Sequence, residues 1–317
     1  MTITDRIDAI TEIPAQARSC TPPIPKSVKI ELTGRCNYMC TFCARSDRLR
    51  KQADMDQGLY ERLALEMRQA GVEELGMFYL GESFMVPWLP AAIAFAKNIG
   101  YPYVFLTTNG SLSTPERVGA CMRVGLDSLK FSLNYADSEQ FADIARVKEA
   151  IFFQMMDNII QAREVRDRVE AETGHRCGLY ASYIAYDDEQ GEKMKDLVEK
   201  VEPHLDEIYA LPLYNQADMV TDREQDKGWS IKAGNPGRLD NMRDPIPCWA
   251  VFTEGHITWD GRLSACCFDH DGRFDMGDLT EMSFSQAWQS EKFQLLRTAH
   301  LERDVQGTVC ETCVAYQ

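Results

Sequence analysis

VKIELTGRCNYMCTFC (residues 28–43) joins a strand-like segment to three closely spaced cysteines. Alternating β-branched and apolar residues are typical of a buried strand, and the polar turn after them ends it. Cys36, Cys40 and Cys43 follow with the spacing C-x3-C-x2-C. Each iron of a [4Fe–4S] cube usually takes one thiolate, so three local cysteines leave one iron for a chelating small molecule. Structural zinc, the alternative along with unligated thiols, would need a fourth ligand close by, and no histidine is near.

Outward from this loop, strand-like and helix-like segments alternate along the chain. The strand-like segments are 27–32, 74–80, 103–108, 128–133, 177–186 and 207–213. The helix-like segments are 59–70, 87–98, 113–124, a long stretch with apolar residues from Phe152 to Ile159, and 189–201. Six βα repeats in series predict an α/β fold, a partial (βα)6 barrel of the TIM type, with the active site where the strands end. The charged end of the long helix, 163–172, is predicted to face solvent.

The cysteine loop after the first strand resembles the signature of the radical SAM enzymes. In that family the open iron binds the amino and carboxylate groups of S-adenosylmethionine (SAM), and reductive cleavage releases a 5′-deoxyadenosyl radical. The resemblance covers roughly residues 27–215 and implies cofactor contacts at strand ends, although Gly-Glu and Asn-Gly pairs are also ordinary turn sequences. The implied cofactor-binding residues are Phe42 near the adenine, Gly81, Glu82 and Ser83 in YLGES (79–83), Asn109 in TTNG (107–110), and Ser132 and Asn134 after the fourth strand.

A second, looser set of cysteines lies near the end of the chain. Twelve residues separate Cys248 from Gly261, four separate Gly261 from Cys266, and Cys310 and Cys313 form a CxxC pair. This pattern resembles the SPASM domain in its shortened, twitch form, which implies an auxiliary [4Fe–4S] cluster with four cysteine ligands that acts as a one-electron conduit. A tetrahedral zinc site is the alternative, since four thiolates suit both metals. The expected cofactors are therefore SAM and two [4Fe–4S] clusters.

These patterns divide the chain into three parts. Residues 1–26, in which Pro22, Pro23 and Pro25 disfavour a regular element, are expected to be an irregular lead-in, 27–245 the radical SAM barrel, and 246–317 the SPASM/twitch domain. The Gly- and Pro-rich stretch 233–247 marks the second boundary. Asp260-Gly261 predicts a hairpin turn, and a short amphipathic helix is expected over 284–301.

Charge and composition narrow the choice of partners and location. Lys and Arg number 34 against 49 Asp and Glu, a net charge of −15, which argues against nucleic acid as a partner. No apolar run is long enough for a membrane span and no export signal is evident, so a cytoplasmic protein is expected. ARSDRLRK (44–51) places Arg45, Arg48, Arg50 and Lys51 beside the first cysteines. This basic patch predicts docking of an acidic electron donor, a flavodoxin or ferredoxin; an ordinary solvated loop is the alternative.

Three functions compete on this basis. The first is a radical SAM enzyme that oxidises or epimerises a small polar molecule, a sugar or aminocyclitol, as in the twitch enzymes of aminoglycoside pathways. The second modifies a ribosomal peptide, and the third is a non-catalytic iron–sulfur or zinc protein. Cys267 is the candidate catalytic residue. Strand alternation would point Cys267 away from the cluster bound by Cys266 and toward the mouth of the barrel. There its thiol could return a hydrogen atom to a substrate radical. The alternative is a small buried apolar residue.

Overall fold

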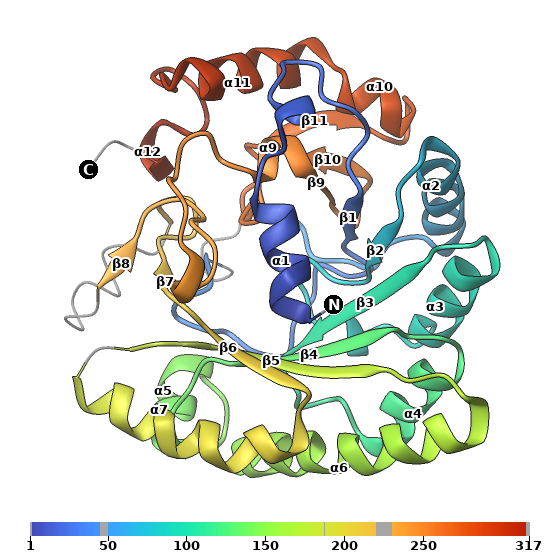
Figure 1. Cartoon of the computed structure of the whole chain (residues 1–317), viewed down its shortest axis with the longest axis vertical. Helices are drawn as coiled ribbons and strands as arrows, with labels where there is room; N and C mark the ends of the chain where they lie inside the picture. Colours follow the sequence, from blue (N-terminus) through green and yellow to red (C-terminus); the bar gives the residue numbers. More distant parts are fainter. Residues whose placement is uncertain (1, 45–49, 187, 220–229, 315–317) are drawn as a thin grey trace.

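The computed structural model describes residues 2–44, 50–186, 188–219 and 230–314. Its centre is a curved sheet in which six parallel strands follow one another in chain order, as predicted. The helices between them cover the outer face of the sheet (Figure 1). The six strands are β1 (Ser27–Ile30), β2 (Glu74–Gly76), β3 (Tyr103–Thr108), β4 (Ser128–Leu133), β5 (Gly178–Ile184) and β6 (Glu207–Leu211). The covering helices are α2 (Gln57–Ala70), α3 (Leu89–Asn98), α4 (Pro115–Arg123), α5 (Ser138–Ala145), α6 (Ala150–Thr173) and α7 (Asp188–Val201).

Helix α2 shows how local sequence sets these elements. Asp56 accepts a hydrogen bond from the backbone N–H of Leu59 at 2.9 Å and so caps the first turn. Gly71 ends the helix at φ 109°, a conformation that favours glycine. Tyr60, Leu63, Ala64 and Met67 lie on one face, fully buried against the sheet and α3. Helical spacing of apolar residues therefore predicted this helix to within two residues of its start.

The sheet continues beyond the six predicted strands. The hairpin expected at Asp260-Gly261 is formed by β9 (Glu254–Ile257) and β10 (Arg262–Ser264), and β11 (Asp275–Asp278) pairs with β10. Strand β9 pairs in parallel with β1 over four residues, so the sheet has nine strands in the order β11-β10-β9-β1-β2-β3-β4-β5-β6. The C-terminal region therefore shares a sheet with the barrel, and β9 covers an edge of β1 that would otherwise be unpaired.

The irregular lead-in expected over residues 1–26 is wrong in its first part. Residues Ile3–Thr11 form a helix, α1, which a reciprocal capping box between Thr2 and Asp5 begins. Helix α1 lies within the curve of the sheet (Figure 1). The backbone N–H of Ile3 donates to Glu207 at 2.8 Å, and Asp8 pairs with Arg238 at 2.8 Å. The prolines that motivated the prediction lie after this helix and do not affect it.

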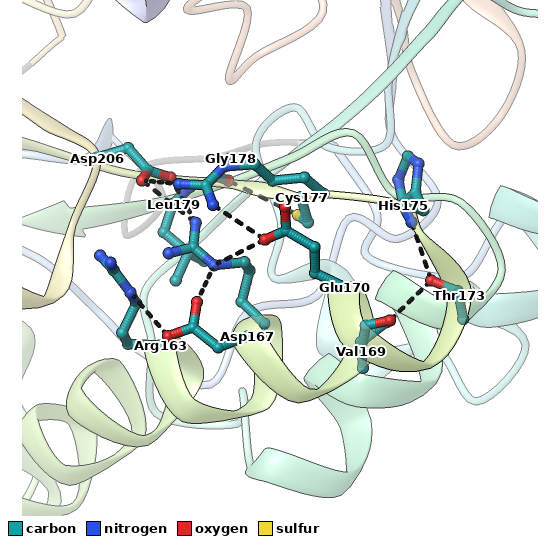
Figure 2. A network of polar contacts seen from close by, with 12 residues as sticks. Arg163, Asp167, Val169, Glu170, Thr173, His175, Cys177, Gly178, Leu179 and Asp206 are labelled. Atoms are coloured by element: carbon teal, nitrogen blue, oxygen red, sulfur yellow. Dashed lines mark hydrogen bonds and ion pairs between the residues drawn. The ribbon is translucent and has the colours of Figure 1, made fainter.

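The expected solvated face at the end of α6 is also partly wrong. Arg166 is 1% exposed, because α6 packs this face against the start of β5 and the loop before β6. Its guanidinium binds Asp206 at 2.9 Å and Asp167 at 2.6 Å. Figure 2 shows this network, in which Asp206 also accepts from the backbone N–H of Leu179 at 2.8 Å. The paired charges fix α6 to two strands, which a periodicity argument could not detect.

Smaller elements complete the molecule, with two further corrections. Helix α3 begins at Leu89 and not at Pro87, and the helix expected over 284–301 is broken by Ser290, which caps a second helix. No helix in the described part of the chain is long and apolar enough to cross a membrane. The remaining elements are η1 (Ala15–Ala17), η3 (Ser83–Met85), η4 (Glu202–His204), β7 (Leu213–Tyr214), β8 (Ile231–Lys232), η5 (Leu239–Asn241), α9 (Ala250–Thr253), α10 (Phe284–Trp288), α11 (Glu291–Glu302) and α12 (Glu311–Val314).

Candidate functional site

The first cysteine loop leaves β1 and is attached to the end of α5. The backbone N–H groups of Met39 and Thr41 donate to the carbonyls of Ala145 and Ile144 at 3.0 and 2.9 Å. Two hydrogen bonds of this kind give the loop a fixed shape between its cysteines. All three predicted ligands, Cys36, Cys40 and Cys43, are partly buried.

Each of these three thiols has a polar neighbour from another part of the chain. Tyr135 Oη lies 3.2 Å from Cys40 Sγ, Asn109 Nδ2 lies 3.9 Å from Cys36 Sγ, and His270 Nε2 lies 3.9 Å from Cys43 Sγ. Tyr135 and His270 were missed in the sequence. Tyr135 directly follows the predicted Asn134, whereas only proximity to the Cys266-Cys267 pair could have drawn attention to His270.

The chemistry of this donor set suits an iron–sulfur cube. Burial raises the pKa of the Cys40 thiol, and the neighbouring Cys43 raises it further, so a bare thiolate is unfavourable there. Binding to iron supplies the compensating positive charge. Among the described residues, no three His, Cys, Asp or Glu side chains converge on a single metal ion. A cube places each thiolate on a different iron, which needs a wider ligand set than one ion does.

Gly81 brings the loop after β2 into direct contact with the cysteine loop. A Cβ atom at this position would lie 2.0 Å from the carbonyl oxygen of Thr33 and 2.7 Å from that of Arg35. The neighbouring Glu82 donates its backbone N–H to the same Arg35 carbonyl at 2.8 Å. Only glycine permits this approach, so the Gly-Glu sequence has a steric basis here.

The Glu82 side chain is turned inward. Its carboxylate is buried and accepts hydrogen bonds from Thr108 Oγ1 at 2.9 Å and from the backbone N–H groups of Asn109 and Phe84 at 2.9 and 3.1 Å. Burial raises the pKa of Glu82 although these bonds oppose the rise. Ser83 Oγ likewise donates to the Met77 carbonyl at 2.5 Å. Through these hydrogen bonds both side chains hold the loop after β2 against the ends of β2 and β3. Contacts of Glu82 and Ser83 with SAM stay predictions.

The other predicted cofactor residues lie at neighbouring strand ends. Asn109 bonds Asn37 of the cysteine loop at 2.9 Å. Ser132 is partly buried on β4, on the same face as Lys130 two residues earlier, and Asn134 follows on that side. The Asn134 carbonyl accepts from Tyr186 Oη at 2.6 Å. The ring of Phe42 lies 6.4 Å from that of Tyr135, both beside the cysteines.

A cavity of about 280 Å³ lies inside the curve of the sheet. Helix α1 lines one end of it through Ile3, Arg6 and Ile7, and strands β1, β3, β4 and β6 line its walls. Phe268 and Cys267 from the C-terminal region border it as well. This volume is close to the lower end of the range that proteins use for small ligands.

Buried charges line this cavity. Lys29 Nζ binds Glu254 at 2.7 Å, and His256 Nε2 lies 3.0 Å from the same carboxylate. Burial favours the neutral acid, but Lys29 and His256 overcome it and hold the pKa of Glu254 at about 2. The lining residue Lys130 bonds Tyr209 Oη at 3.0 Å and, within the described residues, has no carboxylate partner.

The second cysteine set converges as predicted. One small apolar cavity is lined by all four cysteines, which come from three separate places in the sequence: Cys248, Cys266 and the pair Cys310 and Cys313. Phe274 and His300 also line it, and His300 Nδ1 accepts from the backbone N–H of Cys248 at 3.2 Å. Four thiols are the number that a [4Fe–4S] cluster takes, and the role of these four as its ligands stays a prediction.

Cys267 borders both cavities. The strand alternation used to orient it is wrong in its premise, because β10 ends at Ser264 and Cys266 and Cys267 lie in the turn that follows. Its thiol nevertheless reaches the barrel cavity and accepts a hydrogen bond from Asn235 Nδ2 at 3.1 Å. It also lies in the wall of the cavity lined by the four cysteines.

Comparisons with known proteins agree with this geometry. Residues 30–174 match the Radical SAM superfamily, and residues 248–314 match SPASM, an iron–sulfur cluster-binding domain. The GTP 3′,8-cyclase of Chlorobaculum tepidum is 32% identical over 120 residues, which cover 38% of this chain and 36% of that protein. The chain thus matches little more than a third of that relative's length.

Solved structures share the fold over most of the chain. BtrN in complex with AdoMet and 2-DOIA superposes with a TM-score of 0.58 at 17% identity, covering 91% of both chains. Streptococcus suis SuiB bound to S-adenosylmethionine gives a TM-score of 0.62 at 16% identity, covering 86% of this chain and 67% of SuiB. The chain belongs to the radical SAM superfamily and carries a C-terminal SPASM domain. SAM and iron–sulfur clusters are the cofactors that these two matches indicate.

Proposed function

We propose that this enzyme cleaves SAM reductively at Cys36, Cys40 and Cys43 and abstracts a hydrogen atom from a small polar substrate in the barrel cavity, giving oxidation or epimerisation. A reduced [4Fe–4S] cluster at these cysteines would supply the electron that releases the 5′-deoxyadenosyl radical. The observation that carries the proposal is the cavity of about 280 Å³, because its lining includes both β1, the strand from which the cysteine loop leaves, and Cys267.

The proposed roles of the strand-end residues follow from their placement. Phe42 lies beside the cysteines, where its ring can contact the adenine of SAM. Asn109, Ser132 and Asn134 lie on adjoining strand ends, where their polar groups can bind the ribose and carboxylate. Gly81 permits the β2 loop to approach the cysteine loop, which leaves backbone carbonyls available for the SAM ammonium.

The charges of the cavity indicate the class of small substrate. Three cations of the lining are paired with carboxylates, namely Lys29 with Glu254, Arg6 with Glu74 at 2.9 Å and Arg238 with Asp8 at 2.8 Å. Lys130, bonded to Tyr209, adds a positive charge that would repel an ammonium group. We therefore favour a hydroxylated, sugar-type substrate that is neutral or anionic over a cationic aminocyclitol.

Peptide modification is the second candidate. It draws support from solved SuiB bound to its precursor peptide SuiA, with a TM-score of 0.61. The cavity volume of about 280 Å³ favours the smaller substrate, because an extended peptide needs more room. BtrN, solved with the small molecule 2-DOIA, covers a larger share of this chain.

The position of Cys267 allows either outcome of the reaction. Transfer of its thiol hydrogen atom to the substrate carbon radical would give epimerisation and leave a sulfur radical on Cys267. Loss of an electron and a proton from the substrate radical, with the electron accepted by the auxiliary cluster, would give oxidation. Because Cys267 borders both cavities, its position is compatible with hydrogen-atom transfer to the substrate and with electron transfer to the auxiliary cluster.

We propose that the electron donor is a flavodoxin or ferredoxin. The basic patch proposed as its docking site differs from the one that the sequence predicts. Arg50 does not belong to this patch, because its guanidinium pairs with buried Glu31 at 3.2 Å and is only 10% exposed. Arg45 and Arg48 lie outside the described residues. Lys51 is exposed and remains available to an acidic partner.

Iron content and SAM cleavage test the proposal together. The reconstituted protein should hold about eight irons per chain, the content of two cubes. Replacing Cys36, Cys40 and Cys43 by alanine should leave about four irons and abolish formation of 5′-deoxyadenosine. The matched variant, Cys310→Ala with Cys313→Ala, should keep the cluster that cleaves SAM. Cleavage by the triple variant would contradict the proposed function.

A further inference from the structure

Five consecutive residues connect the surroundings of the two cysteine sets. This segment, 266–270, which we call the bridging segment, begins at Cys266 in the wall of the auxiliary cavity. Its second and third residues, Cys267 and Phe268, line the barrel cavity. Its last residue, His270, ends 3.9 Å from Cys43 Sγ. The SPASM region therefore reaches into the immediate surroundings of the first cysteine loop.

The hydrogen-bond partners of His270 define which ring atom is protonated. Nε2 lies 3.2 Å from Gln216 Oε1 as well as 3.9 Å from Cys43 Sγ. An amide oxygen accepts and never donates, so Nε2 carries the hydrogen in this arrangement. A thiolate is also an acceptor. One N–H group thus faces both the Gln216 amide oxygen and the sulfur of Cys43.

The backbone around His270 is held in place. Tyr79, in the loop after β2, donates its hydroxyl to the Cys266 carbonyl and accepts from the backbone N–H of Asp269 at 3.3 Å. Asp269 Oδ1 accepts from the backbone N–H of Gly272 at 2.8 Å and closes the turn after His270. His270 itself has no exposed surface. The imidazole is therefore a fixed, water-excluded donor, and a hydrogen bond is electrostatically stronger in such surroundings.

We propose that His270 donates a hydrogen bond from Nε2 to the Cys43 thiolate and thereby raises the reduction potential of the cluster that cleaves SAM. The proposal rests on the proposed function, since it requires a cluster at Cys36, Cys40 and Cys43. Hydrogen bonds to ligand sulfurs stabilise the reduced cluster more than the oxidised one, because reduction adds negative charge. His270 is a positioning residue that acts through Cys43, and it makes the SPASM region part of the first cluster's environment.

Redox titration of the reconstituted holoenzyme tests this role. The cluster that binds SAM is recognised by the change in its electron paramagnetic resonance signal when SAM is added. His270→Leu should lower the midpoint potential of that signal, and the signal of the auxiliary cluster should move less. His270→Gln, whose amide nitrogen can take the place of Nε2, should restore most of the shift. The matched control His175→Leu, at a histidine between α6 and β5, should leave both potentials unchanged.

Two further measurements keep the test decisive. Iron content and thermal unfolding show whether each variant folds and loads both clusters. Where His270→Leu does not, His270→Asn and His270→Gln provide the comparison, because both keep an amide and only the longer side chain reaches Cys43. A SAM-responsive cluster whose potential is the same in all variants would overturn this proposal and leave the proposed function intact. A wild-type protein with no SAM-responsive signal would overturn both.

Discussion

At the scale of single residues, the site depends on close contacts between chain segments. A sequence pattern can point to the residues involved, but the structure gives the physical reason. Gly81 was selected because a Gly-Glu pair follows a strand, and the structure adds the reason, namely two carbonyl oxygens where a Cβ atom would lie. Cys267 was selected by an argument from strand alternation. Its premise fails at Ser264, where the strand ends, but the thiol still reaches the barrel cavity.

Gly81→Ala should separate the loop after β2 from the cysteine loop. The added methyl group would lie 2.0 Å from the Thr33 carbonyl, so the backbone must shift. We expect at least a tenfold loss of 5′-deoxyadenosine formation, while the four irons of the auxiliary cluster stay bound. Gly58→Ala is the matched control, because its Cβ would meet only the flexible Asp56 side chain at 3.1 Å. Unchanged SAM cleavage in Gly81→Ala would refute the steric role.

Cys267→Ala distinguishes the two outcomes of the reaction. The variant should still cleave SAM, because Cys267 is not a ligand of the first cluster. If the thiol returns a hydrogen atom, the variant should give a dehydrogenated or abortive product, and solvent deuterium should enter the wild-type product. Mass spectrometry of the product in deuterated buffer measures both. Normal, deuterium-free product from both proteins would favour oxidation through the auxiliary cluster.

At the scale of elements, the joint between β1 and β9 carries the buried charges of the barrel. In the register of this joint Glu254 lies opposite Ser27 and His256 lies opposite Lys29, so the ion pair between Lys29 and Glu254 runs diagonally across the two strands. A charge pair between the first strand and a strand more than 200 residues later ties the two ends of the barrel fold together. A buried ion pair of this kind adds little to the net stability of the fold. Removing one partner alone is nevertheless strongly destabilising, because the other charge stays buried and unpaired.

Lys29→Met should therefore destabilise the protein by about 3 kcal/mol, because it leaves the Glu254 carboxylate buried and without its main cation. Guanidinium unfolding of the holoenzyme measures the loss. Replacing both residues, Lys29→Met with Glu254→Leu, should recover most of it, since no unpaired charge remains. A double variant as unstable as the single one would show that packing and not charge dominates at this joint.

The neighbouring His256 predicts a pH dependence of stability. Burial lowers the pKa of His256, although Glu254 opposes the shift and Lys29 adds to it. The unfolded chain then binds a proton near pH 6.5 that the folded protein does not take up, so stability falls as the pH drops below about 6.5. His256→Gln should reduce this slope between about pH 7 and 5.5, measured as the free energy of unfolding. An unchanged slope would assign the dependence to other groups.

At the scale of the whole molecule, the sequence could predict the parallel barrel because its strands and helices are consecutive and strongly patterned. It could single out both cysteine sets, the first by its local spacing and the second by its resemblance to the SPASM domain, and the structure brings the second set around one small cavity. It could not show that β9 joins the barrel sheet, since strand pairing over such a separation leaves no local signal. For the same reason it missed His270 and the Lys29–Glu254 pair, whose roles depend on distant segments meeting. Helix α1 has a local signal, the capping box of Thr2 and Asp5, which the prolines after it obscured.

The pairing of β1 with β9 also has a consequence for biosynthesis. The first strand of the barrel emerges from the ribosome early, but its partner is made only after residue 254 has been added. Until then β1 presents an open edge that can pair with other chains, and the barrel behind it stays incomplete. Because cluster insertion needs Cys36, Cys40 and Cys43 in a settled loop, we expect iron loading to follow release of the finished chain. Nascent chains would therefore depend on chaperones for nearly the whole of translation.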